Sequence, residues 1–178
     1  MAKYTKRGLV RSWVKQYKVA YTKTMGEYVA DLAVLGYEAI MYAYQRREFK
    51  HRTRNLHDSY GSAVYVNGEL EPTSIRFVGP ELSTGDDKHT GMSGRDTLLA
   101  YFDNPGVDIS GDIVLLCVAA MEYAGYLEDG THRGGYEIQV ISAANDYLQQ
   151  NWHRISKNKP KEFEIIRARV ITGGDSYS

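Results

Sequence analysis

The chain has 178 residues, of which 22 are basic and 22 acidic, so its formal net charge is zero. Its single cysteine, Cys117, excludes a framework of disulfide bonds. No apolar run reaches the roughly 20 residues of a membrane span, and the first residues lack the apolar core of a secretory signal peptide. We therefore expect a single domain without a membrane partner, made in the cytoplasm.

The charge is unevenly distributed along the chain. Residues 1–54 carry 12 basic and 4 acidic side chains, whereas residues 55–130 carry 3 basic and 13 acidic ones. The basic part of one copy could therefore dock on the acidic part of an identical neighbour, a head-to-tail contact that closes into a ring. The alternative is that these charges pair within one subunit, and the sequence does not decide between the two. The 15 tyrosines, against 4 phenylalanines, fit half-buried interface rings or simply a tyrosine-rich core and surface.

A basic segment opens the chain. Residues 1–24 contain seven basic side chains and no acidic one, with apolar residues between them. We assign them to an arm or short helix that precedes the domain. Thr24 and Glu27 have the spacing of a capping box, which predicts that the next helix begins at Met25.

A long helix is predicted over residues 25–49. Its apolar residues recur at steps of three and four, which places them on one face of a helix. They are Val29, Leu32, Ala33, Gly36, Ile40 and Ala43. Arg46 and Arg47 in the last turn suit the negative end of the helix dipole.

After this helix the pattern becomes that of strands. Residues 60–66 and 73–78 predict two strands, and Asn67-Gly68 between them is a strong signal for a tight hairpin turn. Residues 79–96 are rich in small and polar side chains and predict a flexible loop insertion. Ser93 is placed to cap a short helix that an Asn-Pro-Gly turn at 104–106 ends.

The second half of the chain supplies the remaining elements. The apolar run 112–120 is typical of a central strand, and it places Cys117 in the core. A second helix over 136–155 and a last strand over 162–172 follow, before a disordered tail at 173–178. This order predicts an α+β domain over 25–172, in which the long N-terminal helix and the second helix pack on a mainly antiparallel sheet.

Motifs for catalysis and metal binding are missing from the sequence. It contains no phosphate-binding loop, dinucleotide fingerprint, His-Glu-x-x-His motif or pair of cysteines. Asp103, Asp108 and Asp112 lack the spacing and the closing glutamate of a calcium loop, so a turn explains them better. A buried Cys117 would be a poor nucleophile. We therefore expect no enzymatic activity, no metal site and no cofactor.

The basic segment has two functional interpretations. Its positive side chains, with aromatic residues among them, would contact DNA phosphates without reading sequence, or would bind the acidic segment of a neighbouring copy. Protein docking is favoured because the matching acidic partner exists in the chain itself. The residues assigned to such a contact are Lys3, Lys6, Arg7, Arg11, Lys15 and Lys18.

Two short runs resemble the tail-completion, or neck-protein, family of tailed double-stranded DNA phages. Residues 52–59, Arg-Thr-Arg-Asn-Leu-His-Asp-Ser, are similar to the family's Arg-Thr-Gly-x-Leu-x-x-Ser pattern, which follows a long helix and opens a hairpin. Residues 123–131, Tyr-Ala-Gly-Tyr-Leu-Glu-Asp-Gly-Thr, are similar to the run that leads into the family's second helix. Arg54 stands where the family usually has glycine, and Gly134-Gly135 replace its usual Pro-Phe.

The resemblance implies a structural virion protein. Such a subunit would form a ring at the head–tail junction, around the channel that DNA crosses, and would contact the portal and adjacent connector or tail proteins. It would be found in the virion, and in the host cytoplasm during assembly. The subunit contacts that we expect are made by Tyr123, Tyr126, Glu128 and Asp129 on one side and by Arg46, Arg47, Arg52 and Arg54 on the other.

Overall fold

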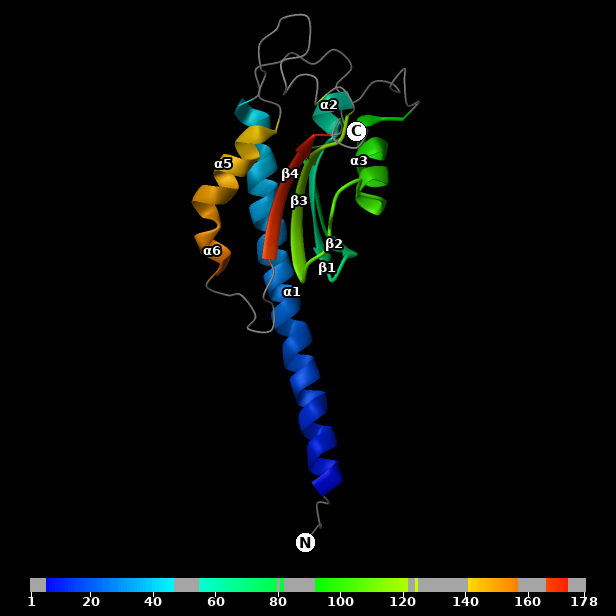
Figure 1. Cartoon of the computed structure of the whole chain (residues 1–178), viewed down its shortest axis with the longest axis vertical. Coiled ribbons are helices and arrows are strands. Elements are labelled where there is room, and N and C mark those ends of the chain that lie inside the picture. Colours follow the sequence, from blue (N-terminus) through cyan, green and yellow to red (C-terminus); the bar gives the residue numbers. More distant parts are fainter. Residues whose placement is uncertain are drawn as a thin grey trace, which may run out of the picture.

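The computed structural model describes residues 6–46, 55–79, 81, 92–121, 124, 141–156 and 166–172. They form an α+β fold around a four-stranded sheet whose strand order is β2-β1-β3-β4. The long helix α1 (Lys6–Arg46) and helix α5 (Ser142–Asn151) cover one face of the sheet, and helix α3 (Gly94–Asp103) lies on the other (Figure 1). The predicted fold class is confirmed.

The hairpin of β1 (Tyr60–Val66) and β2 (Glu69–Phe77) turns at Asn67-Gly68, as predicted. Both turn residues have positive φ, 53° and 80°, the backbone that a tight turn between right-twisted strands requires. Strand β2 begins earlier than expected and contains Pro72, which an edge strand tolerates because its outward amide needs no partner.

Strand β3 (Ile113–Ala119) is the centre of the core, and all seven of its residues are buried. It pairs antiparallel with β1 and parallel with β4 (Ile166–Thr172), so the sheet is mixed and mostly antiparallel. Its alternate side chains face opposite layers. Leu115 and Cys117 pack with α1 and α5, and Leu116 and Val118 pack with α3.

Helix α1 starts far earlier than predicted. The expected N-cap at Thr24 is wrong, because Thr24 lies inside a helix that runs without interruption from Lys6. Residues 6–24 contain no proline, so nothing in this segment ends the helix. The predicted arm and the predicted long helix are therefore one element.

Helix α3 follows the sequence prediction at its start. Ser93 is the N-cap, and its Oγ accepts a hydrogen bond from the amide of Asp96 at 3.2 Å. Residues 94–96, which were predicted to belong to the flexible loop, form the first turn of this helix. The short helix α2 (Asn55–Asp58) precedes β1 and is held by the Ser59 hydroxyl, which donates to the carbonyl of Leu56 at 2.9 Å.

The second predicted helix is divided in the structure. Helix α5 ends at Asn151, and the short helix α6 (His153–Ser156) follows it. An ion pair fastens this region to α1, since Arg154 Nη1 donates to Glu38 Oε2 at 2.6 Å, and the Tyr147 hydroxyl donates to the same oxygen at 3.1 Å. The predicted tail at 173–178 and residues 136–140 of the predicted helix lie outside the described residues.

Candidate interaction site on helix α1

The first half of α1 projects from the body of the molecule. Figure 1 shows it extending well beyond the sheet and the other helices. Lys15, Gln16, Lys18, Thr22 and Thr24 are exposed, and these are all the side chains before residue 25 whose placement is described. Residues 6–24 would span roughly 28 Å at the usual helical rise. Because most helical stability in proteins comes from packing, a segment of this kind is suited to a partner.

The second half of α1 carries an apolar stripe on its outer side. Ala30, Val34, Tyr37 and Met41 recur at steps of four, three and four residues, which places them on one helix face. Val34 is 49% exposed and Tyr37 is 38% exposed, whereas Met41, at the end of the stripe, is partly buried and packs against the core. The opposite side of the same helix packs on the sheet through Leu32, Leu35, Ala39 and Ile40. We call the four outer residues the outer stripe.

Acidic side chains border the outer stripe. Glu27 and Asp31 are exposed and stand one helical turn apart, on the flank of the stripe. Glu38 continues this row, where it accepts hydrogen bonds from Arg154 and Tyr147. An apolar surface with an acidic border is suited to a partner helix that has an apolar face and basic side chains.

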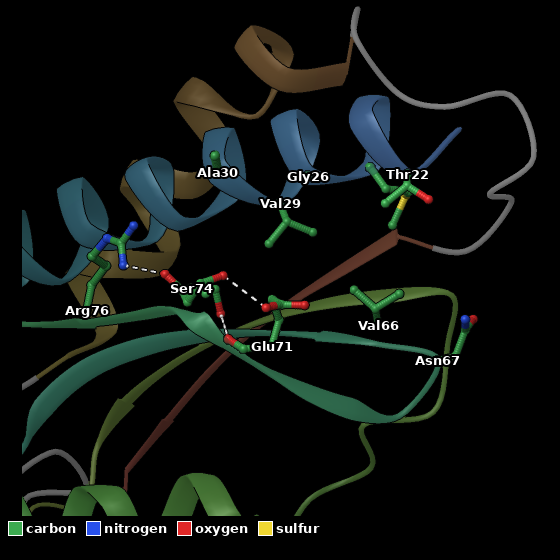
Figure 2. A pocket seen from close by; sticks show the side chains of 11 residues that line it. Thr22, Gly26, Val29, Ala30, Val66, Asn67, Glu71, Ser74 and Arg76 are labelled. Carbon is green, nitrogen blue, oxygen red and sulfur yellow. Dashed lines mark hydrogen bonds between the residues drawn. The ribbon is translucent and has the colours of Figure 1, made fainter. Parts of the chain in front are cut away.

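A groove lies beside the stripe, between α1 and the β1–β2 hairpin (Figure 2). Its volume is about 520 Å³. Met25, Gly26, Val29 and Ala30 line its helix side, and Ala30 also belongs to the outer stripe. The groove is therefore continuous with the stripe, at the point where the projecting half of α1 leaves the body. Its sheet side is lined by Val66, Asn67, Glu71, Thr73, Ser74 and Arg76.

The polar side chains of the groove are engaged within the hairpin. Glu71 Oε1 accepts from the Thr73 hydroxyl at 2.9 Å, and Arg76 Nη1 donates to the Thr73 carbonyl at 2.8 Å. Ser74 Oγ accepts from the amide of Val64 at 2.7 Å, where the β1–β2 register shifts. These contacts fix the shape of the groove's sheet side, and among the described lining residues they do not bring an acid, a base and a nucleophile to one point.

The side chains of Cys117, His57 and Asp58, which could in principle be reactive, are buried in the structure. Burial raises the pKa of the Cys117 thiol to about 12, so this buried thiol is protonated at neutral pH, and its predicted burial is confirmed. His57 Nδ1 lies 2.5 Å from Asp58 Oδ1, and both residues are buried. The His57 ring meets the Tyr44 ring nearly at a right angle, with the ring centres 4.8 Å apart. The described part of the chain holds no group of three or more His, Cys, Asp or Glu side chains able to bind a metal ion.

The structure places only some of the predicted contact residues. Lys15 and Lys18 are exposed on the projecting half of α1, and Lys6, Arg7 and Arg11 are positions of the same helical segment. The Arg46 guanidinium carbon lies 4.3 Å from the centre of the Tyr42 ring, so this side chain is held within the subunit. The remaining predicted contacts lie outside the described residues: Lys3, Arg47, Arg52, Arg54, Tyr123, Tyr126, Glu128 and Asp129.

The outer stripe was not predicted from the sequence. The spacing of Ala30, Val34, Tyr37 and Met41 is itself a helical signal, but a helix with two apolar faces shows its uncovered face only when the fold is known. No helix in the described residues is long and apolar enough to span a membrane.

The fold and the surface define an α+β protein with a helical extension beyond its own core. The chain matches no family model, no curated protein and no solved structure. Its function is therefore inferred from the chain's own geometry and from its short sequence motifs.

Proposed function

We propose that this protein is a structural subunit of a tailed-phage virion, which assembles with identical copies into a ring at the head–tail junction. The observation that carries the proposal is the first half of α1, a helical segment that projects beyond the body with exposed Lys15 and Lys18. A helix in this position is suited to assembly, because packing against another subunit supplies the contacts that its own fold lacks.

Charge supports assembly with identical copies. The projecting half is basic throughout, with no acidic residue before Glu27, while residues 55–130 have a net charge of −10. Two segments of one subunit thus carry opposite net charge, which favours a head-to-tail contact. A head-to-tail contact generates a closed ring when the rotation between neighbours closes.

The two sequence runs support the place in the virion. Residues 52–59 and 123–131 resemble neck-protein motifs, and the first of them lies between α1 and the β1–β2 hairpin, as in that family. The ring would surround the DNA channel and contact the portal and adjacent connector or tail proteins. The protein would act without a cofactor and without catalysis.

Light-scattering chromatography and negative-stain microscopy of the purified full chain test this function. We expect a ring, either from the protein alone or on addition of purified portal or tail proteins. A strictly monomeric protein that also fails to bind portal and tail proteins would overturn the proposal.

A second candidate is a DNA-binding accessory protein, favoured by the exposure of Lys15 and Lys18 on a projecting helix. Contacts to phosphates would give an affinity for any duplex that falls steeply with salt. Fluorescence anisotropy with two unrelated duplexes tests this function. We expect Lys15→Gln with Lys18→Gln to weaken both complexes equally, and unchanged binding by this variant would exclude the candidate.

A further inference from the structure

We infer that the projecting half of α1 from one copy packs on the outer stripe of α1 in the next copy. This inference rests on the proposed self-assembly, and it places the acidic side of the contact at Glu27 and Asp31 of α1 rather than in the acidic segment 55–130. The occupant of Ala30, Val34, Tyr37 and Met41 is thus residues 6–24 of a second copy of this chain.

The outer stripe has the chemistry of a helix-binding surface. Val34 and Tyr37 are among the most exposed large apolar side chains of the described residues, and they lie next to each other on one helix face. The adjoining groove extends the apolar surface around Gly26 and Ala30. Tyrosine is favoured in such contacts because its ring packs while its hydroxyl stays hydrated.

The projecting half has a matching pattern in its sequence. Val10, Val14, Tyr17 and Tyr21 recur at steps of four, three and four, the same spacing as the outer stripe. Positions so spaced share one face of a helix. Arg7, Arg11, Lys15 and Lys18 recur at steps of four, four and three and so form a basic row along the same segment.

Charge identifies the partner surface. The basic row belongs to a segment without a single acidic residue, and the outer stripe is bordered by exposed Glu27 and Asp31. A basic apolar helix and an acid-bordered apolar stripe attract each other, and like surfaces repel. The projecting half of one copy therefore prefers the outer stripe of another copy to its projecting half.

The two surfaces lie on opposite sides of the same helix. The apolar positions of the projecting half, 10, 14, 17 and 21, lie 20 residues before the outer-stripe positions 30, 34, 37 and 41. At 3.6 residues per turn, a displacement of 20 residues corresponds to a rotation of about 200° around the helix axis. Two copies therefore cannot satisfy both contacts with each other through one pair of straight helices. Each copy must engage a different neighbour on each side, which is the arrangement that a ring requires.

Substitution of Val34 by lysine in the full chain is the first test. Val34 is exposed, so we expect Val34→Lys to keep the wild-type melting temperature of dispersed subunits while weakening assembly at least about tenfold. Leu99→Lys is the matched control, because Leu99 is 37% exposed on α3, on the other side of the sheet. We expect rings from this control.

A charge exchange is the second test. Glu27→Lys with Asp31→Lys should weaken assembly, and so should Lys15→Glu with Lys18→Glu. The four substitutions combined in one chain restore opposite charges across the contact, so we expect this variant to recover assembly. Amide hydrogen exchange supplies a readout without substitution, since residues 6–24 should become protected when wild-type subunits assemble.

The outcomes separate this contact from the proposed function. Wild-type rings with equal assembly by Val34→Lys and Leu99→Lys would overturn the contact and leave the structural role intact. Equally fast exchange of residues 6–24 in dispersed and assembled protein would also overturn the contact alone. A wild-type protein that stays monomeric with every virion partner would overturn both.

Discussion

Gly36 lets α1 lie close to the sheet. A Cβ at this position would stand 2.8 Å from Leu115 Cδ1 and 2.8 Å from Ser62 Oγ. Because the core cannot yield without distortion, we expect Gly36→Ala to lower the free energy of unfolding by about 1–3 kcal/mol, despite the better helix propensity of alanine. Urea unfolding measures the change.

Gly26 in the same helix is the matched control, since a Cβ there would have no atom within 4 Å. Alanine is favoured over glycine in a helix, so Gly26→Ala should raise the free energy of unfolding by about 0.5–1 kcal/mol. Equal stabilisation by the two substitutions would show that α1 does not approach the sheet this closely.

Two buried serines differ in their hydrogen bonding. Ser74 Oγ accepts from the Val64 amide at 2.7 Å and donates to the Glu71 carbonyl at 2.6 Å. Ser62 Oγ is buried and has no hydrogen-bond partner within the described structure. We expect Ser74→Ala to cost about 1–3 kcal/mol of unfolding free energy, and Ser62→Ala to be neutral or slightly stabilising. Equal losses in denaturant titrations would contradict this assignment.

Burial of Cys117 makes stability depend on alkaline pH. The thiol has a pKa of about 12 in the folded protein, against an ordinary value of 9.0. Below pH 9 the Cys117 thiol is protonated in both the folded and the unfolded chain, so its contribution to stability is fully present. As the pH rises from 9 towards 12, the unfolded chain releases the proton first, so stability falls by about 1.4 kcal/mol per pH unit. Cys117→Ala should show a shallower decline in urea unfolding at pH 8 to 10.5, because only the tyrosines whose pKa burial raises then contribute. An identical decline in both proteins would contradict the role of Cys117.

Among the elements, the α5–α6 region is attached to α1 by apolar burial in α5 more than by the ion pair between Arg154 of α6 and Glu38. Leu148 of α5 is buried in the core, so Leu148→Ala should cost about 2–5 kcal/mol of unfolding free energy. The Arg154–Glu38 pair is 45% and 33% exposed and is screened by solvent, so Arg154→Ala should cost much less. Thermal melts at low and high salt distinguish the two, since only the Arg154 effect should shrink with salt. The reverse order of losses would contradict this view.

Elements with local signals were predictable from the sequence. The Asn67-Gly68 turn, the Ser93 cap and the apolar run of β3 each depend on neighbouring residues, and the structure contains all three. The start of α1 was missed because Thr24 and Glu27 imitate a capping box in mid-helix. The parallel pairing of β4 with β3 could not be predicted from the sequence, because it joins residues far apart in the chain.

The candidate site, too, was predictable from local sequence only in part. The basic character of residues 6–24 is evident from composition alone, and Lys15 and Lys18 are exposed. The outer stripe depends on which face of α1 meets the sheet, and that is decided by the packing of Leu32, Leu35 and Ile40. A periodic pattern cannot state which of two apolar faces is covered.

At the scale of the whole molecule, the separation of charge predicts how assembly responds to salt. The contact proposed for α1 sets a basic row against Glu27 and Asp31 at a solvent-exposed border. Raising the ionic strength from about 0.1 M to about 1 M shortens the screening length from about 10 Å to about 3 Å. We therefore expect rings to dissociate with added salt, as measured by light scattering, while the melting temperature of dispersed subunits changes little. Assembly strengthened by salt would mean that apolar packing alone drives it.

The position of β4 has a consequence for synthesis. Strand β3 gains its second neighbour only from residues 166–172, and until then its apolar residues have an open edge of unpaired amides and carbonyls. On the ribosome, β1 and β2 emerge before β3 and can form their ladder at once, whereas the other edge must wait for most of the remaining chain. The interval between the emergence of β3 and that of β4 is thus when the nascent protein is most prone to aggregate, and a chain shortened before β4 would remain in that state.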